Sequence, residues 1–213
     1  NTIYRAVMAL KEKYNINSGV HVFVEKNIPI GSGLGGPSSN AATALKEMAS
    51  IWGLSPGGDA LRELGATVGA DVPLFLYGRP CIMRGVGDKI SPIDLPPLWY
   101  LIVYPHVSIS TRAVYSALKI VLRKNQNDVK LMGKFDTFRD ISVILENDLE
   151  KVGIGMCPAI QTIKDRLIEA GSVGALMSGS GSSVFGIFEN KEKAEKASAS
   201  LAGMGDVFVA HSI

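Results

Sequence analysis

The sequence contains little of what marks several large classes of protein. It has only two cysteines, Cys81 and Cys157, each beside apolar neighbours. This argues against a disulfide-stapled secreted scaffold and favours reduced, buried thiols in an intracellular compartment. No apolar run approaches the roughly 18 residues of a membrane-spanning helix, and no basic start precedes an apolar signal core. The formal net charge is only +2 over 213 residues, so neither nucleic acid nor a membrane surface is indicated as a partner.

Three common catalytic arrangements are also missing. The histidines His21, His106 and His211 lie in separate segments, and none has metal-ligand spacing with a cysteine or another histidine. The serine-rich segment 178–183 never satisfies G-x-S-x-G, the pattern of serine hydrolases. No G-x-x-x-x-G-K-[ST] loop is present. Metal-assisted hydrolysis, serine hydrolysis and a Walker-type nucleotide site are therefore excluded.

What the chain does contain is a glycine-rich stretch, residues 29–42, with the sequence PIGSGLGGPSSNAA. Glycine leaves backbone N–H groups uncovered, so such a loop can fold its amides around an anion. Ala41, Leu45 and Met48 then recur at helical spacing, which predicts a helix over about 39–52 capped by Ser38 or Ser39. An anion in the loop would also lie at the positive end of that helix. A phosphate site is the interpretation, with a flexible surface linker as the alternative.

The loop also contains a literal G-x-G-x-x-G in Gly31, Gly33 and Gly36. The dinucleotide-binding interpretation requires an acidic residue at the end of a second strand about 20 residues further on. That region here is the segment 52–57, WGLSPG, which reads as a turn into another helix. The context therefore argues against a Rossmann fold.

Hydrophobic periodicity predicts the elements of the first half of the chain. Prolines at 92, 96 and 97 then interrupt the pattern and mark a candidate domain boundary. The expected elements are a helix over 2–14, a strand over 20–26, the helix over 39–52, a short helix through Leu61, Leu64 and Val68, and short strands at 81–84 and 89–93 around Gly85-Val86-Gly87.

The second half predicts a strand at 99–104, a helix over 112–123 capped by Thr111, a helical stretch over 138–151, a helix from Pro158 to Ala170, strands at 173–177 and 183–188, a helix over 191–202 and a strand at 206–210. Apart from the helices between 112 and 151, the order is β-α-β-β-α-β. This is the split βαβ, ferredoxin-like arrangement.

Two motifs carry a resemblance to a known family. Residues 29–39 resemble the P-x-x-x-G-L-G-[SG]-x-S-S signature of the GHMP kinases, small-molecule kinases named for galactokinase, homoserine kinase, mevalonate kinase and phosphomevalonate kinase. The segment 177–186, MSGSGSSVFG, resembles their second glycine-rich signature. Further segments are similar to the branch of the family that phosphorylates the 2-hydroxyl of a cytidyl-diphosphate sugar alcohol in non-mevalonate isoprenoid synthesis: Ser39-Asn40-Ala41-Ala42, Gly69-Ala70-Asp71-Val72-Pro73, Ser110-Thr111 and Asn147-Asp148-Leu149-Glu150.

The resemblance implies an α+β fold of two domains. Residues 1–95 would form an incomplete ribosomal-S5-like, ATP-binding domain, and residues 96–213 a ferredoxin-like domain. The family's first motif, with a catalytic lysine and a tyrosine–histidine pair, is expected upstream of Asn1. The chain would then lack about a quarter of the family's length and turn over poorly alone. The resemblance further implies a monomer or homodimer, in a bacterial cytoplasm or a plastid stroma.

The resemblance also implies site residues. ATP phosphates would be held by Pro29, Ile30, Gly31, Ser32, Gly33, Leu34, Gly35, Gly36, Pro37, Ser38 and Ser39, and by Gly179, Ser180 and Gly181, with Asn1 and Lys26 near the adenine and ribose. Ser39 would help to hold Mg²⁺, Asp71 would be the catalytic base, and Thr111 and Tyr115 would bind the cytidyl substrate.

Each assignment has a structural alternative. Asp71 suits an Asx turn or the N-cap of a helix opening at Val72-Pro73. Tyr115 suits a core position on its helix, and Gly179–Gly181 a plain hairpin turn. Two other functions stay open as well: a sibling kinase acting on another small alcohol, such as homoserine or mevalonate, and a nucleotide-binding module without catalysis.

Overall fold

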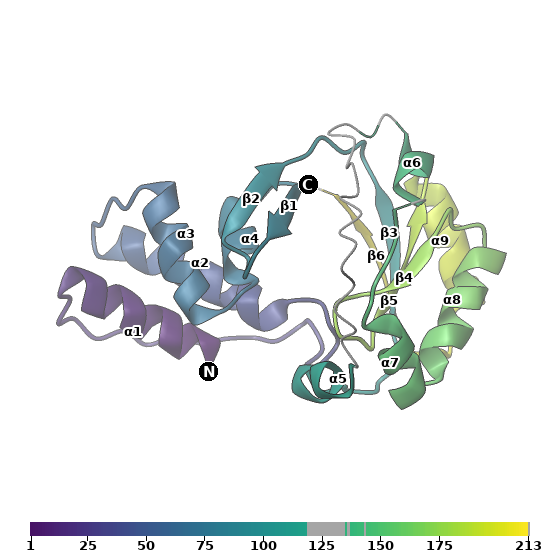
Figure 1. Cartoon of the computed structure of the whole chain (residues 1–213), viewed down its shortest axis with the longest axis horizontal. Helices are drawn as coiled ribbons and strands as arrows, with labels where there is room; N and C mark the ends of the chain where they lie inside the picture. The colour runs from purple at the N-terminus through teal and green to yellow at the C-terminus, as the bar shows by residue number, and fades with distance from the viewer. Residues whose placement is uncertain (119–134, 136, 143, 213) are drawn as a thin grey trace. The chain divides into compact units, whose positions relative to one another are not determined.

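A computed structural model of the chain describes residues 1–118, 135, 137–142 and 144–212. The chain divides into two compact units (Figure 1). Unit 1 comprises residues 1–27 and 35–93, and unit 2 comprises residues 28–34 and 94–213. Most of the glycine-rich loop therefore groups with unit 2, although the helix that follows the loop belongs to unit 1.

Unit 1 consists of packed helices and one hairpin. Its described elements are α1 (Thr2–Tyr14), α2 (Gly36–Ile51), α3 (Gly58–Val68), α4 (Val72–Tyr77), β1 (Cys81–Arg84) and β2 (Lys89–Pro92). The helices meet through apolar stripes, with Leu10, Leu45 and Val72 fully buried in the shared core. The hairpin is antiparallel, and its register pairs Arg84 with Lys89 across a turn.

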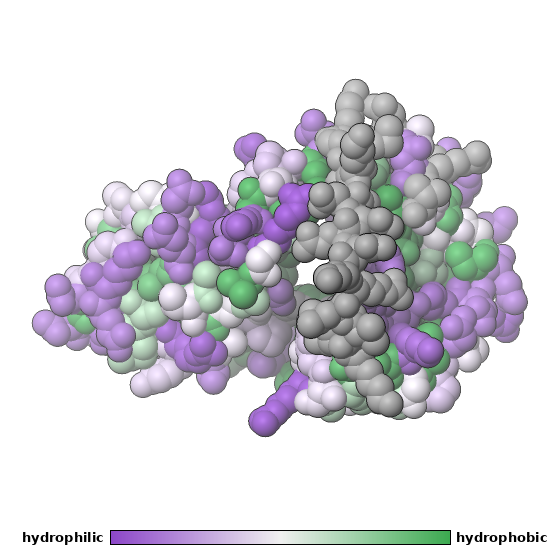
Figure 2. Space-filling model, in the orientation of Figure 1, coloured by the Kyte–Doolittle hydropathy of each residue, from purple (hydrophilic) through white to green (hydrophobic). Residues whose placement is uncertain are grey.

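The solvent-facing sides of these helices carry the polar residues that the periodicity predicts. On the face drawn in Figure 2, hydrophilic residues predominate over α1 and α3, with smaller hydrophobic spots between them. The described helices all fall short of the length and apolarity that a bilayer crossing requires.

Unit 2 is a four-stranded antiparallel sheet covered by helices. Its described elements are β3 (Trp99–Tyr104), α5 (Thr111–Ala117), α6 (Phe138–Ser142), α7 (Glu150–Met156), α8 (Ala159–Glu169), β4 (Ala175–Met177), β5 (Val184–Phe188), α9 (Lys191–Ser200) and β6 (Asp206–His211). The strand order is β4-β5-β3-β6. With α8 after β3 and α9 after β5, this is the predicted split βαβ arrangement, which is confirmed.

The core of unit 2 lies between the sheet and its helices. Leu101 and Val103 of the central strand β3 are fully buried against apolar residues of α8 and α9, including Ile163 and Leu201. Figure 1 shows α8 and α9 on the same side of the sheet. The loops that leave β3 and join β4 to β5 are thereby held on a rigid base.

The predicted strand over residues 20–26 is wrong. These residues take no regular structure, and their side chains are exposed, Phe23 by 88%. A strand is stable only when its backbone groups pair with a neighbour, and no described strand pairs with this segment. The alternation of valines around His21 is typical of a strand, but it cannot supply the pairing.

The helical stretch predicted over 138–151 is two helices, α6 and α7. Directly before α7, the side chain of Asn147 accepts the N–H of Leu149 at 2.9 Å. Such an Asx turn competes with helical hydrogen bonding.

The helix predicted over 112–123 begins at Thr111, and its N-cap is Ser110, whose side chain accepts from the N–H of Ala113. Thr111 is therefore the first helical residue and not the cap. The described part of the helix ends at Ala117, and residues 119–123 lie outside the described residues.

Candidate functional site

The glycine-rich loop is attached to unit 2 through its carbonyl oxygens. Four consecutive carbonyls accept hydrogen bonds from the end of β3, from the segment after it, and from the loop between β4 and β5. The pairs are Ile30 O with the Tyr104 hydroxyl (3.5 Å), Gly31 O with the Ile109 N–H (3.4 Å), Ser32 O with the Ser183 N–H (3.0 Å) and Gly33 O with the Ser178 hydroxyl (3.0 Å).

The N–H groups of the loop are not used in this way. Among the described residues, no N–H between Gly31 and Gly36 donates a hydrogen bond. A carbonyl and the N–H that follows it share one planar trans peptide unit and point in opposite directions. Fixing the carbonyls of residues 30–33 against unit 2 therefore aims the N–H groups of residues 31–34 away from it. A row of backbone donors without partners is a site for an anion.

Gly33 is required by the closeness of the second loop. Its φ is +78°, and a Cβ at this position would lie 2.3 Å from the carbonyl oxygen of Ser178 and 2.8 Å from that of Gly181. Both neighbours are backbone atoms that cannot rotate away. The two glycine-rich loops thus pack backbone against backbone.

The helix after the loop begins earlier than predicted. Its N-cap is Gly35, and Pro37 occupies the first turn, where a missing N–H costs nothing. Ser38 and Ser39 lie inside the helix, and both of their N–H groups donate to Gly35 O, at 3.0 and 2.9 Å. The predicted capping role of these serines is wrong. The Ser39 hydroxyl makes no hydrogen bond with a described residue, so it is available to a ligand.

The second glycine-rich loop, residues 178–183, joins β4 to β5. It is closed by hydrogen bonds from Ser178 N–H to Ser183 O (2.8 Å) and from Gly181 N–H to Ser178 O (2.9 Å). It is therefore a hairpin connection, as the structural alternative expects. The N–H groups of Gly179 and Ser180 nevertheless have no acceptor in the described part of the chain, so both can also meet an anion.

The Ser180 side chain joins this loop to α5. Ser180 is 8% exposed, and its hydroxyl lies 2.8 Å from that of Thr111. On the same helix Val114 is buried, whereas Tyr115 is 56% exposed. The core alternative for Tyr115 is therefore wrong, and its ring presents a free apolar face.

Asp71 stands at the N-cap position of α4 in unit 1, but its carboxylate makes no capping hydrogen bond. The carboxylate is exposed and has no partner among the described residues. The preceding residue is closely packed, because a Cβ at Gly87 would lie 2.3 Å from the carbonyl oxygen of Ala70. The Asp71 carboxylate is therefore not used in helix capping and is open to a ligand.

Asn1 and Lys26 lie elsewhere in unit 1. The Asn1 side chain caps α1 by accepting the N–H of Ile3 at 2.9 Å. Lys26 is exposed in the irregular segment before the loop. The structure gives Asn1 a local structural role and leaves Lys26 without a described partner.

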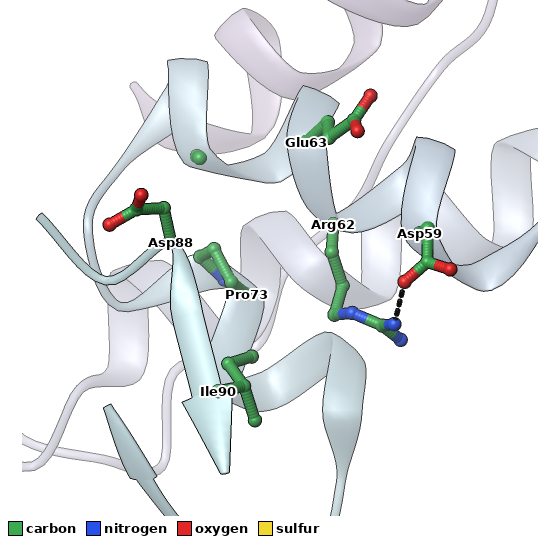
Figure 3. A pocket seen from close by; sticks show the side chains of 7 residues that line it. Asp59, Arg62, Glu63, Pro73, Asp88 and Ile90 are labelled. Atoms are coloured by element: carbon green, nitrogen blue, oxygen red, sulfur yellow. Dashed lines mark hydrogen bonds and ion pairs between the residues drawn. The ribbon is translucent and has the colours of Figure 1, made fainter. Parts of the chain in front are cut away.

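A cavity of about 250 Å³ in unit 1 was not predicted from the sequence. Figure 3 shows Asp59, Glu63 and Asp88 around it together with Arg62, whose guanidinium is paired with Asp59. Three carboxylates against one guanidinium make the lining acidic, which disfavours phosphate. The glycine-rich loops are therefore the better candidate for a phosphate site than this cavity.

Two other kinds of site can be set aside for the described ranges. They contain no group of three His, Cys, Asp or Glu side chains that could hold a metal ion. Burial raises the pKa of the Cys81 thiol, so the reactive thiolate is disfavoured there. Phosphate binding by backbone amides is the chemistry that the described residues support best.

Comparison with known proteins agrees with this chemistry. A family model described as "GHMP kinases N terminal domain" matches residues 1–79, and one described as "GHMP kinases C terminal" matches residues 117–206. The 4-diphosphocytidyl-2-C-methyl-D-erythritol kinase of Geobacter metallireducens is 41% identical over 210 residues, which cover 98% of this chain and 74% of that protein. The enzyme of the same name from Syntrophus aciditrophicus is 40% identical, covering 100% and 77% of the two chains.

Solved structures show the same relationship. A crystal structure of 4-(cytidine 5'-diphospho)-2C-methyl-D-erythritol kinase superposes with a TM-score of 0.77 at 32% identity, covering 99% of this chain and 77% of that one. Homoserine kinase from Cytophaga hutchinsonii superposes with a TM-score of 0.79 at 20% identity, covering 100% and 76%. The second likeness shows a shared fold alone.

The packing of Gly33 predicts the effect of adding one methyl group. We expect Gly33→Ala to displace the loop from Ser178 and Gly181 and to weaken the binding of inorganic tripolyphosphate, measured by calorimetric titration, by about tenfold or more. The control is Gly171→Ala, because Gly171 also has a positive φ (+92°) but nothing within 4 Å of its Cβ position. Equal affinity in the two variants would contradict the anion site.

Proposed function

The chain belongs to the GHMP kinase family, and on that premise we propose that it transfers the γ-phosphoryl group of ATP to the 2-hydroxyl of 4-diphosphocytidyl-2-C-methyl-D-erythritol. The observation that carries the ATP site is the glycine-rich loop, in which the carbonyls of residues 30–33 are bonded within unit 2 while the N–H groups of residues 31–36 have no partner among the described residues. The acceptor is taken from the relatives about 40% identical along nearly the whole chain, which bear that substrate in their names.

In this proposal the glycine-rich loop holds the nucleotide phosphates. The N–H groups of residues 31–36 face the negative charge, and the N–H groups of Gly179 and Ser180 add donors from the second loop. Phosphoryl transfer depends mainly on positioning and on stabilising charge that develops on the transferred group. Preorganised backbone amides supply both, because they need no rearrangement during the reaction.

The ion that accompanies ATP has one candidate protein ligand here. The Ser39 hydroxyl is free of hydrogen bonds to described residues, and Mg²⁺ commonly takes few protein ligands and completes its shell with phosphates and water. We propose that Mg²⁺ binds together with ATP at Ser39, where it would neutralise phosphate charge. Its other ligands are then supplied by the nucleotide and by water.

Asp71 is proposed as the general base. Its carboxylate is exposed and free of described partners, so it can accept the proton of the acceptor hydroxyl as that oxygen attacks the γ-phosphorus. The bond to the acceptor oxygen forms while the bond to the β–γ bridging oxygen breaks, and ADP leaves. The amide of an Asp71→Asn variant could still orient the hydroxyl but could not take its proton.

The exposed ring of Tyr115 is proposed to stack on the cytosine of the acceptor, and the Thr111 hydroxyl to bind the same substrate. Stacking needs an apolar face that is not already packed, which Tyr115 offers. Asn1 and Lys26 stay predictions, near the adenine and ribose, that rest on family position.

A phosphoryl-transfer assay tests the proposed function. The full-length product of the gene that encodes these residues would be incubated with γ-labelled ATP, Mg²⁺ and one of three acceptors: the cytidyl-diphosphate sugar alcohol, homoserine or mevalonate. We expect label to pass to the first acceptor alone. Transfer to another alcohol would assign a sibling activity, and ATP binding without any transfer would indicate a nucleotide-binding module.

We expect Asp71→Asn to lower kcat by about 10²–10⁴-fold, the usual size of general-base help. The affinity for ATP should stay within about twofold of the parent, because the amides that hold the phosphates are unchanged. Turnover and calorimetric ATP titration would be measured side by side. Equal turnover in the two proteins would remove Asp71 from the mechanism.

Tyr115→Ala should weaken binding of the cytidyl substrate while leaving ATP affinity nearly unchanged. The loss of one base–aromatic stack is worth about 1–3 kcal/mol, which is about 5- to 150-fold in the dissociation constant. The matched control is Tyr4→Ala. Tyr4 is also an exposed tyrosine (65%), but it lies in unit 1, whereas Tyr115 lies in unit 2. Equal loss of cytidyl affinity in both variants would refute the stacking role.

A further inference from the structure

Two polar side chains outside the glycine-rich loops hold the second loop in place. The Asn147 amide nitrogen donates to the carbonyl oxygens of Met177 (2.8 Å) and Gly179 (2.9 Å), so both N–H bonds of one amide are used. Its amide oxygen is also used, as it accepts the N–H of Leu149 at 2.9 Å. Asn147 thus uses both of its donors and its acceptor oxygen at once, which fixes the orientation of its amide.

Glu150 holds the same segment three residues further on. One carboxylate oxygen accepts the N–H of Met177 at 2.9 Å, and the other is paired with the ammonium of Lys164 on α8. Both charged side chains are largely covered, with 16% of Glu150 and 19% of Lys164 exposed. A covered carboxylate with partners at both oxygens is held rigidly, because losing either interaction would leave a buried polar or charged group without a partner, which costs free energy.

These contacts set the direction of a loop amide. The carbonyl of Gly179 and the N–H of Ser180 belong to the same planar peptide unit and point in opposite directions. When Asn147 holds the Gly179 carbonyl, the Ser180 N–H is therefore aimed away from Asn147, and it has no acceptor in the described part of unit 2. Gly179 has a φ of +54°, and glycine alone would let this peptide unit rotate.

We propose that Asn147 and Glu150 are positioning residues for the kinase reaction, which fix the second glycine-rich loop so that the Ser180 amide meets the phosphates of ATP. Neither residue touches the reacting atoms in this proposal. The inference rests on the proposed function for the nature of the ligand, and on the contacts of Asn147 and Glu150 for the roles of these two residues. It predicts a selective effect on the nucleotide and none on the acceptor alcohol.

The isosteric change Asn147→Asp tests the proposal most sharply. It keeps the shape of the side chain but replaces two donated hydrogen bonds with a carboxylate facing two carbonyl oxygens. In the full-length gene product at pH 8 we expect the KM for ATP to rise about 10- to 100-fold, the size expected when groups that bind substrate are misplaced by about an ångström. The KM for the acceptor should change less than about twofold.

The pH dependence of that variant separates positioning from a general loss of structure. On protonation, the introduced carboxyl regains one O–H donor and loses its charge, so its ATP affinity relative to the parent should recover as the pH falls from 8 to 5.5. The other charged groups in this described network are Glu150 and Lys164. Both are also present in the parent, so measuring the parent at each pH corrects for any change in their charge. Asn147→Ala, which cannot regain a donor, should show the same loss across the range.

Asp148→Asn is the control, because Asp148 is the exposed neighbour and has no partner among the described residues. It should leave both KM values unchanged. If Asn147→Asp does not fold, Glu150 provides the test instead: Glu150→Gln keeps an acceptor for the Met177 N–H and should raise the KM for ATP several-fold less than Glu150→Ala does.

The outcomes distinguish the inference from the proposed function. A parent protein that fails to bind ATP would overturn the proposed function. A parent that binds ATP normally, beside an Asn147→Asp variant of equal ATP affinity, would overturn the positioning role alone. Equal rises in both KM values, with a lower melting temperature and no recovery at low pH, would also overturn it, since that is the behaviour of a purely structural residue.

Discussion

The candidate site depends on one constraint, the hydrogen bonding of four consecutive loop carbonyls to unit 2. Because each carbonyl is rigidly linked to the N–H that follows it, anchoring the carbonyls of residues 30–33 also orients the donors of residues 31–34. A flexible linker would have neither set fixed. The loop therefore reaches its ligand with its donors already arranged, which lowers the entropy cost of binding an anion.

The same principle is repeated in the second loop, where side chains from outside the loop make the contacts. Asn147 holds the carbonyls of Met177 and Gly179, and Glu150 holds the Met177 N–H. The glycines at 33 and 179 are tolerated in a rigid site because each loop is fixed from outside. Gly33 also provides the close approach that brings the two loops together, because a side chain there would collide with backbone.

The sequence predicted most of the elements of unit 2. The length and aromatic content of residues 99–104 identified β3, and hydrophobic periodicity identified α8 and α9, each of which buries one face. The same periodicity failed at residues 20–26, where alternation was present but no partner strand was. It also failed at 138–151, where two helices stand and the Asn147 side chain makes an Asx turn before the second, a local hydrogen bond that hydrophobic spacing does not report. The domain ranges 1–95 and 96–213 stay a prediction.

Resonance assignment of the backbone amides allows the most direct test of the central claim, that the free N–H groups of the loop bind phosphate. In a ¹H–¹⁵N titration with Mg²⁺ and a non-hydrolysable ATP analogue, the account predicts the largest shifts at the amides of residues 31–36 and at Gly179 and Ser180. Tripolyphosphate should move the same amides, since the phosphates are what they bind. Saturable binding that leaves these amides unshifted, with the changes elsewhere, would contradict the account.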